Sequence, residues 1–240
     1  MENIFTRTEL LIGKAGLDKL KTKRVAIIGV GGVGSFAAEA IARAGVGNIV
    51  LVDGDEVSVS NINRQILALH STLGKPKVEV MEKRIMDINP KINTLVYHRF
   101  YDKTSSDDLL TSDIDYVVDA IDTMRSKIHL IYRCKQLNIP VISSMGAGNK
   151  MDPTAFKVAD LSKTSICPVA RIMRRELRKL GLEEGLKVVY STEPPIKPHT
   201  YVEEEMPLHG RGSIPGSISF VPSAMGLVIA SEVIKDLLKI

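Results

Sequence analysis

A glycine-rich turn between a buried strand and a helix constrains this chain more than any other feature. The turn reads GVGGVG over residues 29–34, and the continuous apolar run RVAII precedes it at 24–28. An alanine-rich segment at 35–44 predicts the helix that follows. Glycines at such a point permit a tight turn and expose backbone N–H groups at a helix N-terminus, where phosphate binds. We therefore expect this turn to hold the phosphates of a nucleotide, through Gly29, Gly31, Gly32 and Gly34.

An acidic residue stands at the place where such folds bind ribose. Asp53 ends the next expected strand, at 48–52, and follows Gly34 by 19 residues (53 minus 34). A carboxylate there can accept both ribose hydroxyls. Dinucleotides and ATP both use this arrangement, so the turn and the acid leave the choice of nucleotide open.

A dense polar segment, DGDEVSVSNINRQ at 53–65, narrows that choice. Arg64 offers a rigid fork of donors and Lys77 a compact positive charge. Neutral donors and a second acid complete the nucleotide-binding set, namely Asn61, Gln65 and Asp55. An enzyme that attacks the α-phosphate of ATP needs such groups, because charge must be stabilised as pyrophosphate leaves. Hydride transfer needs none of them. Each residue alone could serve a turn or face solvent, but the group favours ATP chemistry.

Two acids stand at the end of the fourth expected strand, which covers 115–120. Asp119 and Asp122 fall at the carboxyl edge of the sheet, where ligands of such folds bind. Asp122 is suited to hold a Mg²⁺ ion that bridges phosphates. Asp119 fits either a functional role or a cap of the next helix.

Strands alternate with helices, which predicts an α/β fold: a Rossmann-like, mostly parallel sheet with helices on both faces. Extra C-terminal strands and a closing apolar helix at 222–238 extend it. The pattern predicts helices at 2–21, 77–88, 125–137 and 168–180, and further strands at 94–98, 139–144, 155–159, 187–190 and 217–221. In the first helix, Leu10, Leu11, Leu17 and Leu20 are the expected buried positions. Residues 191–217 contain five prolines and are expected to form a structureless, mobile loop at the substrate mouth.

Composition limits the number of domains, the kinds of partner and the compartment that we expect for this chain. The 240 residues are expected to form one domain over 1–240, with a net charge of +4 that is compatible with nucleic acid but not diagnostic of it. Two cysteines, Cys134 and Cys167, exclude a four-thiolate zinc site and suggest a reducing cytoplasm. The N-terminal residues do not read as a signal peptide, and no apolar run is long enough for a membrane span.

The motifs GVGGVG, DGDEV, SNINRQ, GKPK and DAID resemble the ubiquitin-activating-enzyme superfamily. The resemblance implies an enzyme that adenylates a carboxylate with ATP and Mg²⁺. It implies that Asp53 holds ribose, that Asp122 holds magnesium, and that Arg7 reaches the ATP of a partner subunit in a homodimer. Phosphate-binding roles are implied for Asn61, Arg64, Gln65 and Lys77.

The second half separates branches of that superfamily. Members that adenylate ubiquitin-like sulfur carriers usually have two CxxC pairs for zinc, and this chain has neither. Its segments CPVARIMRRELRK, VVYSTEPP and GSISFVPSAMGLVIASEVIK look like those of tRNA threonylcarbamoyladenosine dehydratases. The branch implies cyclisation of a modified adenosine in tRNA through an acyl-adenylate. Adenylation of a sulfur-carrier protein remains the alternative, and a sulfur-relay partner remains open. A nicotinamide oxidoreductase or a non-catalytic scaffold is less favoured.

Two further features carry predictions. Four arginines recur at helical spacing along one face of the expected helix at 168–180, and this face is either an RNA-phosphate track or solvated: Arg171, Arg174, Arg175 and Arg178. Cys167 precedes Pro168 at the start of that helix, where we expect a small buried residue rather than a nucleophile.

Overall fold

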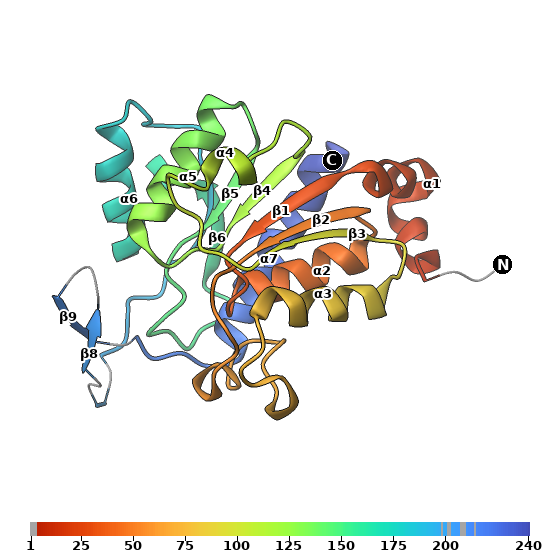
Figure 1. Ribbon diagram of the computed structural model, residues 1–240. Coiled ribbons are helices and arrows are strands. Elements are labelled where there is room, and N and C mark those ends of the chain that lie inside the picture. Colours follow the sequence, from red (N-terminus) through yellow and green to blue (C-terminus); the bar gives the residue numbers. More distant parts are fainter. Residues whose placement is uncertain (1–3, 198, 201–202, 207–209, 214) are drawn as a thin grey trace.

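The chain folds around a seven-stranded sheet with the order β3-β2-β1-β4-β5-β7-β6 (Figure 1). The computed structural model describes residues 4–197, 199–200, 203–206, 210–213 and 215–240. Six neighbouring strands run parallel: β1 (Arg24–Ile28), β2 (Asn48–Val52), β3 (Asn93–Tyr97), β4 (Tyr116–Asp119), β5 (Val141–Ser144) and β7 (Lys187–Ser191). The edge strand β6 (Phe156–Asp160) pairs antiparallel with β7.

The order of the strands reverses at the centre of the sheet. The chain builds β1, β2 and β3 in one direction and then returns to place β4 on the other side of β1. The chain therefore leaves β1 toward α2 on one face of the sheet and leaves β4 toward α5 on the other face. In open α/β sheets this switch point is where ligands bind.

Helices cover both faces of the sheet (Figure 1). One face carries α1 (Thr6–Thr22), α2 (Gly34–Ala44), α3 (Lys77–Ile88) and α7 (Phe220–Leu238). The other carries α4 (Ser106–Leu109), α5 (Met124–Gln136) and α6 (Pro168–Arg178). Short 3₁₀ turns lie at η1 (Val59–Asn61), η2 (His70–Thr72) and η3 (Leu161–Lys163), and β8 (Glu203–Met206) pairs with β9 (Gly210–Ser213) in a separate ribbon.

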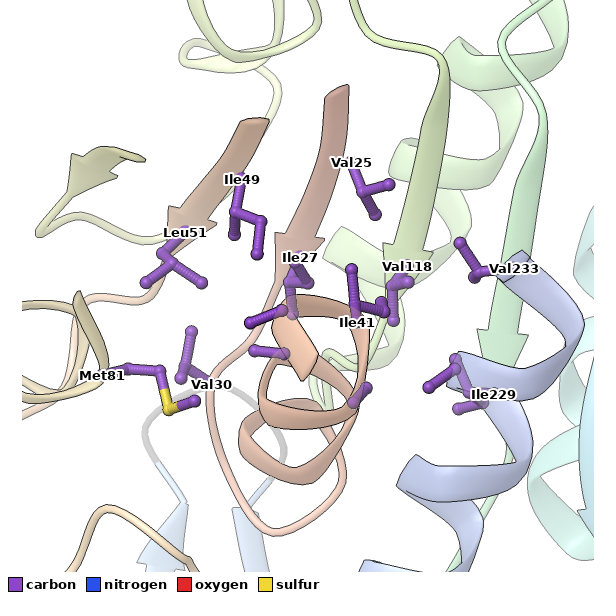
Figure 2. Close-up of a cluster of buried hydrophobic side chains, with 14 of the residues drawn as sticks. Val25, Ile27, Val30, Ile41, Ile49, Leu51, Met81, Val118, Ile229 and Val233 are labelled. Carbon is purple, nitrogen blue, oxygen red and sulfur yellow. The ribbon is translucent and has the colours of Figure 1, made fainter. Parts of the chain in front are cut away.

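Alternate residues of each strand enter different cores. In β1, Val25 and Ile27 face α2 and α7, whereas Ala26 and Ile28 face α5 and α6. Figure 2 shows the first of these cores, which also includes Val30 from the glycine turn. Val30 is fully buried, so the turn is fixed to the core at the point where it crosses the sheet edge.

The predicted fold class is confirmed, and most predicted elements lie within a few residues of their expected places. Two predictions are wrong. Residues 217–219 form no strand, and Phe220 already begins α7. The segment 191–217 is not structureless, because β7 extends through Ser191 and the β8–β9 ribbon follows. Part of that segment, including 201–202, 207–209 and 214, lies outside the described residues.

The prediction for α1 is half right. Leu17 and Leu20 are buried, but Leu10 and Leu11 are 82% and 88% exposed. The cause is a kink at Gly13, whose φ of 70° and ψ of 167° are not helical. Before this kink Ile12 still packs against the core, but Leu10 and Leu11 face away from it. None of the helices in the described part of the chain is long and apolar enough to cross a membrane.

Candidate functional site

The glycine turn lies at the carboxyl end of β1 and packs tightly against its neighbours. Gly29 has a φ of 92°, and a Cβ at that residue would lie 2.7 Å from the Ala120 carbonyl oxygen. A Cβ at Gly34 would lie 1.8 Å from the Gly29 carbonyl oxygen. Only glycine, which has no Cβ, fits at either residue. A Cβ at Gly31, in contrast, would meet nothing closer than Gln65 Nε2 at 3.8 Å, so space remains above the turn.

Asp53 fixes that turn from the end of β2. Its carboxylate accepts the Val30 N–H at 2.6 Å and the Asp55 N–H at 2.8 Å, one on each oxygen. Burial raises the pKa of Asp53, although the Lys77 charge and these two backbone donors act against the rise. Each carboxylate oxygen keeps a second lone pair. Asp53 can therefore hold the turn and still accept ribose hydroxyls.

The polar segment 61–65 lies beside the glycine turn. Asn61 is buried, and its side-chain oxygen accepts the Ser58 N–H at 3.1 Å. Arg64 Nη1 donates to the Ser60 carbonyl at 2.7 Å, and Arg64 Cγ would lie 3.6 Å from a Cβ at Gly32. Gln65 is buried, and its Oε1 finds no hydrogen-bond partner among the described residues. The atom of Gln65 nearest the space at Gly31 is its Nε2, and an amide nitrogen there can donate to an anionic ligand.

Lys77 begins α3 and forms an ion pair with Asp55, with Nζ and Oδ2 2.6 Å apart. The Lys77 side chain is almost fully buried, whereas that of Asp55 is 52% exposed. The ammonium group therefore lies at the boundary between the core and the surface. An anionic ligand could replace the exposed carboxylate as its partner.

Asp119 and Asp122 have different environments. Asp119 is fully buried at the end of β4 and pairs with Lys127 of α5, Oδ2 to Nζ 2.8 Å. Asp122 is exposed on the turn that follows, and Thr123 Oγ1 donates to it at 3.3 Å. Asp119 is thus part of a buried ion pair rather than a simple helix cap. Asp122 has the access that a metal bound to phosphates requires.

The structure places the other predicted residues away from this cluster or on the surface. Arg7 is exposed near the start of α1, which Figure 1 shows on the side of the molecule opposite the loops after β1 and β4. On α6, Arg171, Arg175 and Arg178 are exposed. Arg174 is half-buried and donates to the Thr164 carbonyl at 2.9 Å, so its guanidinium already has a partner in the chain.

The cysteines have no exposed thiol. Cys167 is buried at the N-cap of α6, as expected, and Cys134 is buried in α5. Burial raises the pKa of Cys134 to about 12. Among the described residues, no cluster of three or more His, Cys, Asp or Glu side chains could hold a metal ion.

Sequence reasoning missed several residues that order the site. Lys127 and Ser143 both bind the Asp119 carboxylate, and their partners become visible only in three dimensions. Asn149 has a φ of 57° and its side chain accepts the Gly216 N–H at 2.6 Å, which ties the loop after β5 to the segment before α7. The Asn-Lys dipeptide at 149–150 was the available turn signal for that loop.

Together these features define an α/β domain of the nucleotide-binding class, with a tight glycine turn, a buried acid and several cationic or neutral donors at one switch point. The chain belongs to the ThiF family, whose model matches residues 5–240.

Individual relatives extend this result. A tRNA threonylcarbamoyladenosine dehydratase of Bacillus subtilis is 48% identical over 240 residues, 98% of this chain and 94% of the relative. The crystal structure of the E. coli tRNA N6-threonylcarbamoyladenosine dehydratase TcdA in complex with ATP matches with a TM-score of 0.89 at 35% identity, covering 98% of this chain and 93% of that one. The sulfur carrier protein ThiS adenylyltransferase of E. coli is 37% identical over 101 residues, 42% of this chain and 39% of the relative.

Proposed function

We propose that this chain is an ATP-dependent enzyme that cyclises threonylcarbamoyladenosine in tRNA, with loss of water, through an acyl-adenylate. The observation that carries the proposal is the polar cluster at the switch point, in a chain that is similar over nearly its full length to dehydratases of that name. The whole of 1–240 acts as one adenylating domain.

The reaction needs no external nucleophile. A carboxylate oxygen of the substrate bonds to the α-phosphorus of ATP, and the bond to pyrophosphate breaks. A nitrogen or oxygen of the same side chain then bonds to the acyl carbon, its proton passes to solvent, and AMP leaves with the carboxylate oxygen. The ring closes readily because both groups belong to one side chain. No catalytic cysteine is required, which agrees with the burial of Cys134 and Cys167.

The residues at the switch point fit ATP. Backbone N–H groups of the glycine turn and the side chains of Asn61, Gln65 and Arg64 would bind phosphates, and Asp53 and Asp55 complete the nucleotide site. Lys77 would stabilise the negative charge that develops on the leaving pyrophosphate. A Mg²⁺ ion at Asp122 would neutralise phosphate charge. The exposed Asp122 carboxylate can reach such an ion. We propose no role for zinc, because two cysteines cannot form a four-thiolate site.

We further propose a homodimer in which Arg7 reaches the ATP of the partner subunit. Two observations support it: α1, which carries Arg7 in its first turn, lies on the side of the molecule away from the loops after β1 and β4, and Leu10 and Leu11 on the next turn of α1 are exposed. Contact with a second copy would bury these leucines. A guanidinium supplied in trans would act as arginine fingers do.

tRNA is the macromolecular substrate. The surface that binds the tRNA phosphates lies on α6, and its exposed arginines are Arg171, Arg175 and Arg178. Arg174 belongs to the same surface, and its hydrogen bond to the Thr164 carbonyl holds it against the protein. The described residues between β7 and α7 contribute to the substrate mouth. We place the enzyme in the cytoplasm, off the membrane, with a sulfur-relay protein as a possible further partner.

The experiment is mass spectrometry of tRNA nucleosides after incubation of threonylcarbamoylated tRNA with the protein, ATP and Mg²⁺. We expect AMP, pyrophosphate and a nucleoside lighter by one water. ADP and phosphate as products would refute the adenylate mechanism. A ubiquitin-like carrier that becomes adenylated at its C-terminal carboxylate, with no change to the tRNA, would favour the alternative function instead.

Subunit mixing tests the role of Arg7. Arg7→Ala and Lys77→Ala dimers should each be nearly inactive. In a mixed dimer, one site keeps its own Lys77 and receives Arg7 from the other subunit, so activity should return. Verified exchange without recovery would mean that Arg7 does not act across the interface.

A further inference from the structure

A buried ion pair lies directly beneath the nucleotide site, and the chemistry proposed above makes no use of it. The carboxylate of Asp119 and the ammonium of Lys127 are 2.8 Å apart, and their side chains are 0% and 2% exposed. Removing two charges from water is costly, and an apolar pair of similar volume often gives equal or greater stability. The pair therefore calls for an explanation beyond stability.

Among the described residues, the other side-chain hydrogen bonds of this pair go to Ser143 and Ile121, at the carboxyl edge of the sheet. Ser143 of β5 donates its hydroxyl to Asp119 Oδ2 at 2.6 Å, and the Ile121 N–H donates to Asp119 Oδ1 at 3.2 Å. Lys127 Nζ donates to the Ile121 carbonyl at 3.0 Å. Ile121 is thus held at both its N–H and its carbonyl, one by each member of the ion pair.

The turn that is held in this way forms part of the nucleotide site. The Ala120 N–H donates to the Ile28 carbonyl at 2.9 Å, which joins the turn to the end of β1. The Ala120 carbonyl closes the space above Gly29, and Ala120 Cβ would lie 3.2 Å from a Cβ at Gly34. Asp122 is the next residue after Ile121 and is exposed, so the direction of the Ile121 carbonyl sets where the Asp122 side chain projects.

We propose that Lys127 is a positioning residue for ATP and its metal ion: it fixes the 120–122 turn and thereby holds Asp122 at the phosphate site. This inference rests on the proposed function and assigns Lys127 no contact with the nucleotide. A lysine suits the task because one ammonium group has three donors and can bind the carboxylate and the carbonyl at once. Groups that orient a metal ligand typically change metal affinity or activity about 10–100-fold when they are removed.

The test separates positioning from folding with a charge-balanced variant. Lys127→Met alone would leave the Asp119 charge buried without a partner and would destabilise the fold. Asp119→Asn with Lys127→Met removes both charges, and the introduced asparagine can still accept the hydrogen bond from Ser143. Lys135→Met on the same helix α5 is the control, since the ammonium group of Lys135 donates to the Gly185 carbonyl and not to the ion pair.

Three measurements are made on each purified full-length protein: thermal unfolding, the Kd for AMP in EDTA, and the Kd for ATP with and without Mg²⁺. We expect the double variant to fold and to bind AMP as the wild type does, but to bind Mg²⁺–ATP about tenfold more weakly. Lys135→Met should match the wild type throughout. A folded double variant with wild-type affinity for Mg²⁺–ATP would overturn the proposal.

A second variant keeps the proposal testable if the double variant does not fold. Lys127→Arg preserves the charge but replaces the compact ammonium with a planar fork. We expect faster amide hydrogen exchange at 121–123 and weaker Mg²⁺–ATP binding; no change in either would also overturn the proposal. The proposed function fails in a different way, because then the wild-type protein itself would show no Mg²⁺-dependent affinity for ATP.

Discussion

Two glycines of the same turn should respond to the same substitution in opposite ways. Gly34→Ala places a methyl group 1.8 Å from the Gly29 carbonyl oxygen, where backbone must move to admit it. Overpacking of this kind costs about 3 kcal/mol at the upper end of its usual range. For a chain of this size that loss corresponds to a fall in Tm of roughly 6–12 °C.

Gly31→Ala meets nothing within 3.8 Å in the free protein, so its Tm should stay close to that of the wild type. The added methyl group would, however, stand in the space proposed for phosphate. At ATP one hundred times its Kd, binding stabilises the wild type by about 2.7 kcal/mol, and a hundredfold loss of affinity would leave about 0.4 kcal/mol. ATP should therefore raise the Tm of wild type clearly and that of Gly31→Ala barely.

The assay is thermal unfolding of the three proteins with and without Mg²⁺–ATP. Gly34→Ala should begin from a lower Tm, and Gly31→Ala should lose only the response to ATP. A Gly31→Ala protein that keeps the full ATP-dependent shift would refute the placement of phosphates over Gly31. A Gly34→Ala protein with the wild-type Tm would refute the packing argument.

Three further predictions concern single side chains. Lys77→Met should reduce adenylation at least about 100-fold. The fold should be retained, because the partner carboxylate of Asp55 is half exposed and can be solvated. Lys75→Met, at a neighbouring exposed lysine, is the matched control, and equal losses of activity in both variants would contradict a specific role for Lys77. Cys134, whose pKa burial raises to about 12, should resist alkylation at pH 8 until the protein is unfolded, and rapid labelling of native protein would show that α5 opens. Glu39 has a lowered pKa, since hydrogen bonds from Arg84 and Arg43 outweigh the upward effect of burial. Its contribution to stability is present above the unfolded value of 4.5 and is lost as pH falls through the lower folded value. Glu39→Gln should therefore be destabilising near pH 7 and nearly neutral in strong acid, and a pH-independent difference in unfolding free energy would exclude the ion pairs as the cause.

Local signals in the sequence were sufficient to predict the seven strands of the main sheet and the glycine turn. Buried parallel strands are short apolar runs, and the glycine turn, Asp53 and the 53–65 segment each follow such a run at the same edge of the sheet. Apolar periodicity failed at Leu10 and Leu11, since spacing describes a face of a helix but not whether anything covers it. The kink at Gly13 decides that question.

The spacing of residues along the sequence could not predict which side chains or strands pair with one another in three dimensions. Lys127 reads as one more lysine on a helix until β4 and α5 are placed side by side, and only then does it meet Asp119. The β8–β9 ribbon was missed for another reason. Its strands read EEEM and GRGS, which show none of the alternation of apolar and polar residues that marks a half-buried strand.

The contact between α7 and the glycine turn has a consequence for the order of events during synthesis. Gly226 of α7 allows the helix to lie against the turn, since a Cβ there would come within 2.4 Å of the Val33 carbonyl oxygen. The turn is translated between β1 and α2, and α7 after every other described element. A nascent chain that lacks α7 would expose the buried side of α2 and leave the turn without one of its supports. ATP binding should therefore arise only when α7 has emerged and docked, so that partly made chains neither hold nucleotide nor compete for substrate.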